Sequence, residues 1–235
     1  MKRTKPINTE LLKNIEPLTP AQESLWEQYA LGKNLVAYGC AGTGKTFCLL
    51  YQALKEVLTE STPYEKIYIV RSLVPTREIG FLPGTHEDKS YLYQVPYRNM
   101  VKHMFSMYTD KEFETLYDDL QRQETISFWS TSFLRGTTLD NAIIIVDEFE
   151  NLNFHELDSI MTRVGENSKI FFAGDASQSD LLKVTERTGI LDFMQILQGM
   201  PEFSKVEFGL EDIVRSGLVR SYLVSKINQG YDENI

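Results

Sequence analysis

The chain has 235 residues, of which 42% are hydrophobic and 24% are charged, and its formal net charge is −9. This composition is typical of a single globular domain with a substantial core, and the acidic balance argues against a general nucleic-acid coat. The longest apolar runs have the length of a strand, so we expect no membrane partner. The basic N-terminus has no apolar signal region, and Cys40 and Cys48 are expected to be thiols in a reducing compartment, so we expect a cytoplasmic location. Two separated cysteines and three scattered histidines predict neither a disulfide framework nor a metal site built on these residues.

Short apolar runs alternate with stretches of helical period, which predicts an α/β fold of three layers: a mostly parallel sheet with helices on both faces. In chain order we expect a helix at 21–30, a strand at 35–38, a helix at 45–58, a strand at 67–70, a helix at 95–108, strands at 125–128 and 142–146, a helix at 154–164, a strand at 170–173, a helix at 190–197, a strand at 206–208 and a helix at 212–227. The Pro- and Gly-containing stretch 71–95 is expected to be a long functional loop. Residues 1–18 are expected to form an N-terminal extension, and residues 19–235 one domain.

Residues 39–46 read GCAGTGKT and fit G-x-x-x-x-G-K-[ST] between a predicted strand and a predicted helix. The glycines allow successive backbone N–H groups and the helix N-terminus to face a phosphate. Lys45 would reach the β- and γ-phosphates of ATP, and the Thr46 hydroxyl would ligate Mg²⁺. The predicted phosphate-binding residues are Gly39, Cys40, Ala41, Gly42, Thr43, Gly44, Lys45 and Thr46.

The run AIIIV at 142–146 predicts a strand buried on both faces, and Asp147 and Glu148 follow at its carboxyl end. Asp147 would hold Mg²⁺ in its outer shell, while Glu148 would polarise a water molecule for hydrolysis. The alternative is that Glu148 and Glu150 begin a solvated loop.

The segment IFFAGDASQSDL at 170–181 begins as a buried strand and ends in a polar turn. In P-loop ATPases with a catalytic Glu, the corresponding strand lies between the strand of the acidic pair and the strand of the P-loop. Gln178 would then sense the γ-phosphate, with Asp175 in a more structural role. The alternative is an Asx-type turn that leaves Gln178 exposed.

These motifs together resemble the PhoH family of P-loop ATPases, which is related to the first RecA-like domain of superfamily 1 helicases. The resemblance extends over roughly residues 19–227 and rests on residues 39–46, 69–84 (IVRSLVPTREIGFLPG), 135–151, 162–181 and 212–219. It implies a RecA-like P-loop NTPase fold and an ATPase associated with RNA or phosphate-starvation responses. A chain this short resembles the versions found in bacteriophages, which would place it in the host cytoplasm. Departures from the family pattern at Ser72, Thr137 and Glu150 bear on nucleic-acid contacts rather than on the ATP site.

Gln22 has two possible roles, because it lies just upstream of the P-loop strand. In helicase-like ATPases a Gln at this place reads the adenine edge. The sequence from Thr19 to Gln22 also fits a capping box at the start of a helix, with Pro20 at its first position. The residues alone leave both roles open.

Several arginines are candidates for contacts with phosphate. Arg215 would serve as an arginine finger or lie on the solvated face of a helix, while Arg71, Arg77 and Arg135 would contact a nucleic-acid backbone or be structural. A chain with one RecA-like domain needs a neighbouring subunit to complete a helicase-type site, and Arg215 is the leading candidate for the residue that this subunit supplies. We therefore expect a homo-oligomer, a hexameric head-to-tail ring. The predicted function is a ring-forming Mg²⁺-ATPase acting on RNA or single-stranded nucleic acid. The alternatives are a nucleotide-dependent assembly switch that does not translocate, and a P-loop phosphotransferase.

Overall fold

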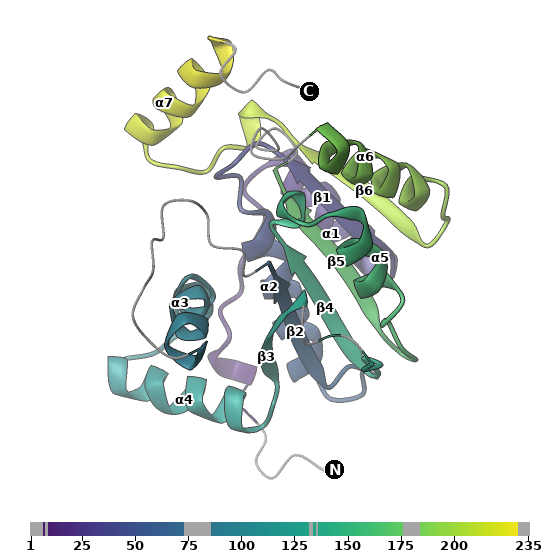
Figure 1. Cartoon of the computed structure of the whole chain (residues 1–235). Coiled ribbons are helices and arrows are strands. Elements are labelled where there is room, and N and C mark those ends of the chain that lie inside the picture. The colour runs from purple at the N-terminus through teal and green to yellow at the C-terminus, as the bar shows by residue number, and fades with distance from the viewer. Residues whose placement is uncertain are drawn as a thin grey trace.

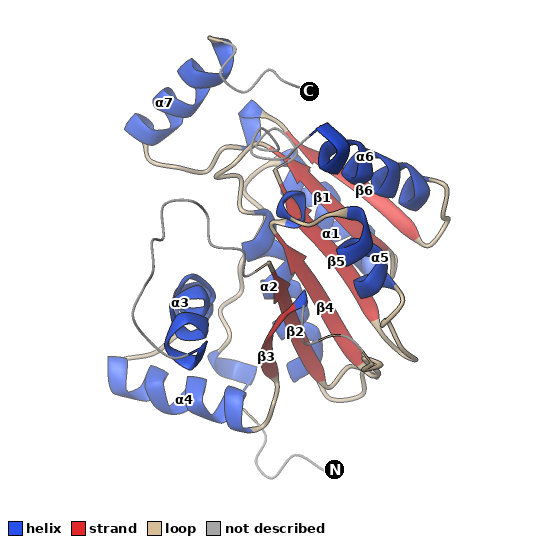
Figure 2. Cartoon of the chain, viewed as in Figure 1, coloured by secondary structure: helices blue, strands red, loops and turns tan. Residues whose placement is uncertain are grey.

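The structure is a computed structural model, and it describes residues 7, 9–72, 86–131, 134, 136–175 and 184–229. Parallel strands in these ranges form a six-stranded sheet in the order β3-β2-β4-β5-β1-β6 (Figures 1 and 2). The strands are β1 (Asn34–Gly39), β2 (Lys66–Arg71), β3 (Ile126–Ser130), β4 (Ala142–Asp147), β5 (Lys169–Gly174) and β6 (Phe203–Phe208). All six predicted strands are confirmed, and so is the position of β5 between β4 and β1.

Strand β4 has the continuous apolar sequence that a strand covered on both faces requires. Every one of its residues is buried. Alternate side chains enter different cores, with Ile143 and Ile145 in one and Ile144 and Val146 in the other. The residues at the carboxyl end of β4 are therefore held rigidly, because β4 cannot shift without disrupting the packing of one of the two cores.

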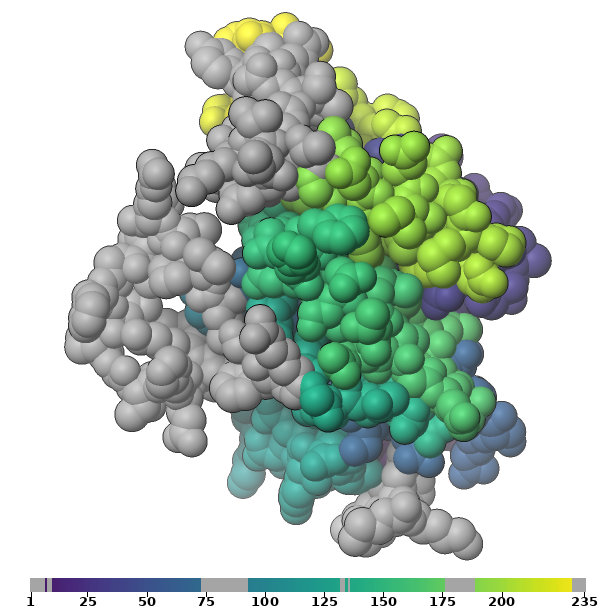
Figure 3. Space-filling model, turned by 45° about the vertical axis from the view of Figure 1, so that its right-hand side comes forward, coloured from purple at the N-terminus to yellow at the C-terminus, as the bar shows by residue number. Residues whose placement is uncertain are grey.

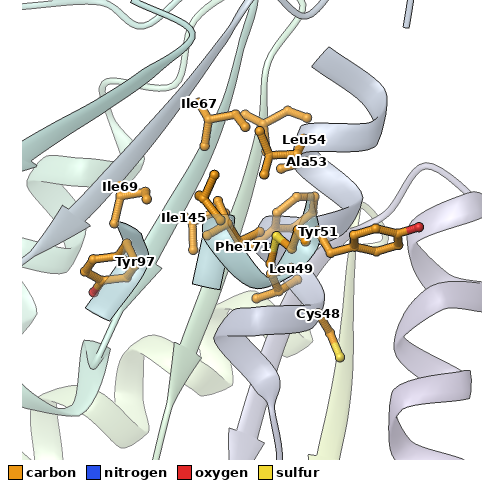
Figure 4. Packing of buried hydrophobic residues seen from close by; sticks show 14 of the residues in the cluster. Cys48, Leu49, Tyr51, Ala53, Leu54, Ile67, Ile69, Tyr97, Ile145 and Phe171 are labelled. Atoms are coloured by element: carbon orange, nitrogen blue, oxygen red, sulfur yellow. The ribbon is translucent and has the colours of Figure 1, made fainter. Parts of the chain in front are cut away.

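Helices cover both faces of the sheet, as the sequence predicted (Figure 1). They are α1 (Pro20–Ala30), α2 (Lys45–Leu58), α3 (His86–Met104), α4 (Asp110–Arg122), α5 (Phe154–Met161), α6 (Val184–Gln198) and α7 (Gly217–Asn228), with short 3-10 turns at Thr9–Leu11, Phe149–Asn151 and Leu210–Asp212. One core joins α1, α2, α3 and α4 to the sheet, and Figure 4 shows α2 packing its Leu49 and Leu54 near Ile67 of β2 and Ile145 of β4. The other core lies under α5 and α6, which are neighbours on the face seen in Figure 3.

The structure corrects the predicted helices at several ends. Helix α3 begins at His86, so the predicted loop 71–95 was wrong over its last ten residues, and α3 ends at Met104 instead of 108. The sequence prediction missed α4, which starts with a capping box between Thr109 and Glu112. Helix α5 ends at Met161, three residues earlier than predicted, and α6 begins at Val184, six residues earlier.

The C-terminal helix begins five residues later than predicted because Asp212 is used in a turn. Its carboxylate accepts hydrogen bonds from the backbone N–H groups of Gly209, at 2.9 Å, and Ala21, at 3.2 Å. Asp212 is buried, so this turn fixes the end of β6 to the start of α1. Helix α7 follows at Gly217 and has no buried residue.

The segment before α1 packs against the domain where it is described. Leu12 pairs with Phe105 in an isolated bridge, and the Ile15 N–H donates to the Tyr51 hydroxyl at 3.0 Å. None of the helices in the described ranges has the length and apolar character needed to cross a membrane.

Candidate nucleotide site

The P-loop connects β1 to the N-terminus of α2 through glycines in the left-handed region. Gly39 has φ 118°, Gly42 has φ 76° and Gly44, the N-cap of α2, has φ 85°. Gly39 also lies against β6, where a Cβ atom would meet the Phe208 carbonyl oxygen at 2.2 Å. These positions require glycine, and a turn of this kind at a helix N-terminus favours the binding of an anion.

Lys45 is buried inside this loop. Its ammonium donates to the carbonyl oxygens of Gly39, at 2.8 Å, and Cys40, at 2.7 Å. Burial lowers the pKa of Lys45, while the negative charges of Asp175 and Glu150 act in the opposite direction. The amine is thus held among the groups that surround the predicted phosphate position.

Thr46 and Asp147 join the P-loop to the end of β4. The Thr46 hydroxyl donates to Asp147 Oδ1 at 2.7 Å, and the phenol of Tyr97, from α3, donates to Asp147 Oδ2 at 2.6 Å. Hydroxyl and carboxylate oxygens are the ligands that Mg²⁺ prefers. No cluster of three or more His, Cys, Asp or Glu residues that could hold a metal occurs in the described part of the chain. The residues therefore fit Mg²⁺ bound with phosphate oxygens and water, and they do not fit an all-protein metal cage.

Glu148 leaves β4 in the left-handed conformation, with φ 51°. Its Oε1 forms an ion pair with Arg71 at 2.5 Å, and its Oε2 accepts a hydrogen bond from the Asn151 side chain at 3.2 Å. The guanidinium of Arg71 also lies over the ring of Tyr93, 5.8 Å from its centroid. The predicted general base is thus directed toward the end of β2.

Glu150 is buried next to this carboxylate pair, so the interpretation as a solvated loop is wrong for this residue. Burial, together with the charges of Glu148 and Asp147, raises the pKa of Glu150 to about 8, against hydrogen bonds from backbone N–H groups. Within the described residues its Oε2 has no hydrogen-bond partner. Asp175, at the end of β5, is also buried.

Gln22 reaches the P-loop from the first turn of α1. Its Nε2 donates to the Thr43 carbonyl at 2.9 Å, and its Oε1 accepts from the Leu18 N–H at 2.8 Å. Thr19 is the N-cap and accepts from the Gln22 N–H, as the capping interpretation requires, but the Gln22 side chain bonds to Leu18 and not to Thr19. Both ends of the amide are therefore engaged within the protein.

Arg215 lies before α7 and not on it, so its expected placement on a helix was wrong. Its Cγ lies 2.9 Å from the position of a Cβ on Gly42, and the neighbouring Val214 N–H donates to the Gly42 carbonyl at 3.0 Å. Arg215 and Gln22 line a cavity of about 680 Å³ that also includes Trp26 and Phe47. The cavity runs along the P-loop, as a site for the rest of a nucleotide would.

Three predicted site residues, Gln178, Arg77 and Arg135, lie outside the described residues. One residue of the site, Tyr97, was not found from the sequence. It lies in the predicted helix 95–108, but its contact with Asp147 spans 50 residues and has no local signal.

The fold and the site together define a P-loop protein with the RecA-like α/β fold. The P-loop follows β1, an acidic pair follows β4, and β5 separates these strands. The chain matches the family described as PhoH-like protein over residues 14–227, and it belongs to that family.

Its relatives include a PhoH-like protein of Bacillus subtilis (strain 168), 30% identical over 208 residues, which cover 87% of this chain and 60% of the relative. Another, from Mycobacterium leprae (strain TN), is 30% identical over 210 residues, covering 88% of this chain and 57% of the relative. The chain thus spans about three fifths of the length of these relatives. Among solved structures, the large terminase of a thermophilic bacteriophage in complex with ADP has a TM-score of 0.51 at 12% identity, covering 88% of this chain and 49% of the terminase. This likeness supports the fold.

Proposed function

We propose that this chain is a Mg²⁺-dependent ATPase that acts on RNA or single-stranded nucleic acid. The observation that carries the proposal is the 2.7 Å hydrogen bond from Thr46 to Asp147. It brings the last residue of the P-loop to the carboxylate at the end of β4, although the two lie 101 residues apart in the chain. A phosphate-binding loop with a chance sequence match has no reason to meet a buried carboxylate there.

Each residue near this pair has a proposed role. Lys45 binds the β- and γ-phosphates, Thr46 and Asp147 hold the metal, and Glu148 accepts the proton of the attacking water. Bound Mg²⁺ would neutralise charge on the β- and γ-phosphate oxygens. Gln178 is proposed to sense the γ-phosphate.

Arg215 is proposed to contact phosphate within its own chain, because its side chain already lies on Gly42. A cation at this place would stabilise negative charge on the transferred phosphoryl group. The alternative is that Arg215 acts in trans, on the nucleotide of a neighbouring subunit.

The hexameric ring is part of the proposal and is supported by α7. This helix has no buried residue, and Leu218, Val219 and Tyr222 on it are exposed. An apolar helix surface of this kind suits contact with a second copy of the chain. The proposed contacts of Arg71, Arg77 and Arg135 with nucleic acid are supported by the placement of Arg71 at the ligand-binding edge of the sheet.

The test is the rate of ATP hydrolysis in Mg²⁺ by the purified chain, with and without RNA and single-stranded DNA, together with the mass of the particle in solution. We expect hydrolysis in the wild type and a loss of about a hundredfold or more in Glu148→Gln, because a general base contributes roughly 10²–10⁴-fold. Nucleotide binding should persist in this variant. Equal rates in the two proteins would contradict the role of Glu148, and binding without turnover in the wild type would favour the nucleotide-dependent switch.

A further inference from the structure

Each carboxylate oxygen of Glu148 has a partner in this structure. Arg71 Nη2 pairs with Oε1 at 2.5 Å, and Asn151 Nδ2 donates to Oε2 at 3.2 Å. A general base needs an oxygen lone pair directed at the water whose proton it accepts. Each oxygen keeps a second lone pair, so what these two contacts restrain is the direction of the carboxylate, which they hold toward Arg71 and Asn151.

The direction of this restraint follows from the order of the strands. Val70 of β2 pairs with Val146 of β4, so Arg71 and Glu148 leave neighbouring strands at the same edge of the sheet. The P-loop follows β1, which lies on the opposite side of β4 with β5 between them. The ion pair thus draws the base toward β2 and away from the side of β4 on which the phosphates are expected.

We propose that Arg71 is a positioning residue that restrains Glu148, and that a phosphate group of a nucleic-acid strand frees the base by pairing with Arg71. The inference rests on the proposed ATPase function and adds to it the link between nucleic acid and hydrolysis.

Arg71 is accessible enough for such an exchange. Its side chain is 24% exposed and that of Glu148 is 38% exposed, so the pair is screened by water and contributes about 1 kcal/mol or less. A guanidinium binds a phosphate through two parallel hydrogen bonds, which compete well against a single contact with a carboxylate oxygen. The ring of Tyr93 supports the guanidinium from α3 and would remain beside it after the exchange.

A strand of nucleic acid is favoured over free phosphate because consecutive phosphates bind several cations at once. A further arginine, Arg98, lies on α3. Arg98 pairs with Glu114 of α4, so a second arginine–carboxylate ion pair is present on the same helix as Tyr93.

The test compares wild type, Arg71→Ala and Arg71→Lys in steady-state ATP hydrolysis, alone and with an oligo-U strand, an oligo-dT strand or inorganic phosphate. Lys102→Ala is the matched control, because it removes one cation of α3 that pairs with Asp110 at the surface.

We expect a nucleic-acid strand to raise kcat of the wild type and of the control. Arg71→Ala should raise kcat without a strand by roughly fivefold, which is the scale of an exposed ion pair, and should abolish further stimulation. KM for ATP should not change, and Arg71→Lys should keep most of the restraint.

Several outcomes would overturn the inference. One is a folded Arg71→Ala protein, judged by its melting temperature, whose kcat without a strand equals or falls below that of the wild type. Stimulation of Arg71→Ala by a strand as large as in the wild type would also overturn it. Stimulation by inorganic phosphate equal to that by the strands would show that nucleic acid is not the ligand. Should Arg71→Ala not fold, Arg71→Met, which keeps most of the aliphatic stem and cannot donate to Glu148, is read in the same way. A wild type that binds but never hydrolyses ATP would defeat the proposed function itself, which distinguishes the two failures.

Discussion

The phenol of Tyr97 donates a hydrogen bond to Asp147 Oδ2 at 2.6 Å, while Thr46 occupies the other oxygen of the same carboxylate. Tyr97 is buried, and burial together with the charge of Asp147 raises its pKa far above the usual range. The phenol therefore remains protonated and fixes the carboxylate in the orientation that faces the P-loop. Helix α3, which carries no predicted site residue, thus orients a carboxylate of the proposed metal site.

We expect Tyr97→Phe to weaken the response to Mg²⁺. The change removes a hydrogen bond to a charged group, which is worth about 1.5–3 kcal/mol, so the free energy of unfolding should fall by that order. Because Asp147 also loses its orientation, the Mg²⁺ concentration at half-maximal ATP hydrolysis should rise several-fold. Tyr29→Phe is the control, since Tyr29 is also buried and donates to a carboxylate, that of Glu56, on another part of the fold. An equal shift in both variants would contradict a specific role of Tyr97.

Glu150 predicts a dependence of stability on pH. Its pKa is raised to about 8, so the folded protein holds a proton that the unfolded chain releases near pH 4.3. The contribution of Glu150 to the free energy of unfolding is fully present below the unfolded pKa. It is lost as pH rises toward 8, by up to about 1.4 kcal/mol per pH unit. Glu150→Gln removes the titration but keeps a neutral side chain of similar shape.

The measurement for Glu150 is urea unfolding of wild type and Glu150→Gln at several pH values between 5 and 8. The variant should be close to the wild type at pH 5 and increasingly more stable than it toward pH 8. Glu202→Gln is a control for an exposed carboxylate. Parallel curves for wild type and Glu150→Gln would show that Glu150 does not titrate in this window.

How much of this fold was predictable depends on whether the signal is local. Strands such as β4 were predictable because a run of strand length, here residues 142–146, is apolar at every position. Helix α4 has local signals that the sequence prediction did not use: the capping box of Thr109 and Glu112, and the buried residues Phe113, Tyr117 and Leu120 at helical spacing. The many charged residues of α4 obscured the helical spacing of these three apolar residues.

The P-loop and the acidic pair were predictable because each is a short motif next to a strand. The contacts that orient them were not. Arg71 and Tyr97 meet Glu148 and Asp147 from elements far away in the sequence, and nothing at either residue marks its partner. The pair of Arg71 and Glu148 follows from the order of the strands, which brings β2 next to β4. The pair of Tyr97 and Asp147 follows from the packing of α3 against the sheet.

Gly39 separates steric from conformational effects in the P-loop. A Cβ at this position would lie 2.2 Å from the Phe208 carbonyl oxygen, and φ is 118°. Gly39→Ala should therefore destabilise the protein by about 3 kcal/mol or more, the sum of backbone strain and overpacking against a strand. Gly32→Ala is the matched control, because Gly32 has φ 77° and open space around it. Gly32→Ala should lower the free energy of unfolding, measured by heat or urea, by only about 1–2 kcal/mol. Equal losses in the two variants would exclude the contact with β6 as the cause of the larger loss.

Gln22 predicts a structural effect that can be distinguished from adenine recognition. Because its amide bonds to Thr43 and Leu18, Gln22→Ala should lower the free energy of unfolding by about 1–3 kcal/mol. The affinities for ATP and GTP should then fall together, since the loss acts through the P-loop. A selective loss of ATP affinity, with that for GTP unchanged, would instead assign Gln22 to the adenine edge.

Gln178 lies beyond the described residues, so its role as a sensor depends on the position of β5. That strand ends at Gly174 between the strands that carry the P-loop and Asp147, and the chain from there reaches Gln178 within four residues. A donor directed at the γ-phosphate or at the attacking water acts mainly in the transition state, so Gln178→Ala should lower kcat by about a hundredfold and change ATP affinity little. Gln195→Ala, on the exposed side of α6, is the control. If Gln178→Ala raises the Kd for ATP while kcat stays intact, Gln178 is a binding residue, because a sensor of the transition state cannot leave the chemical step unchanged.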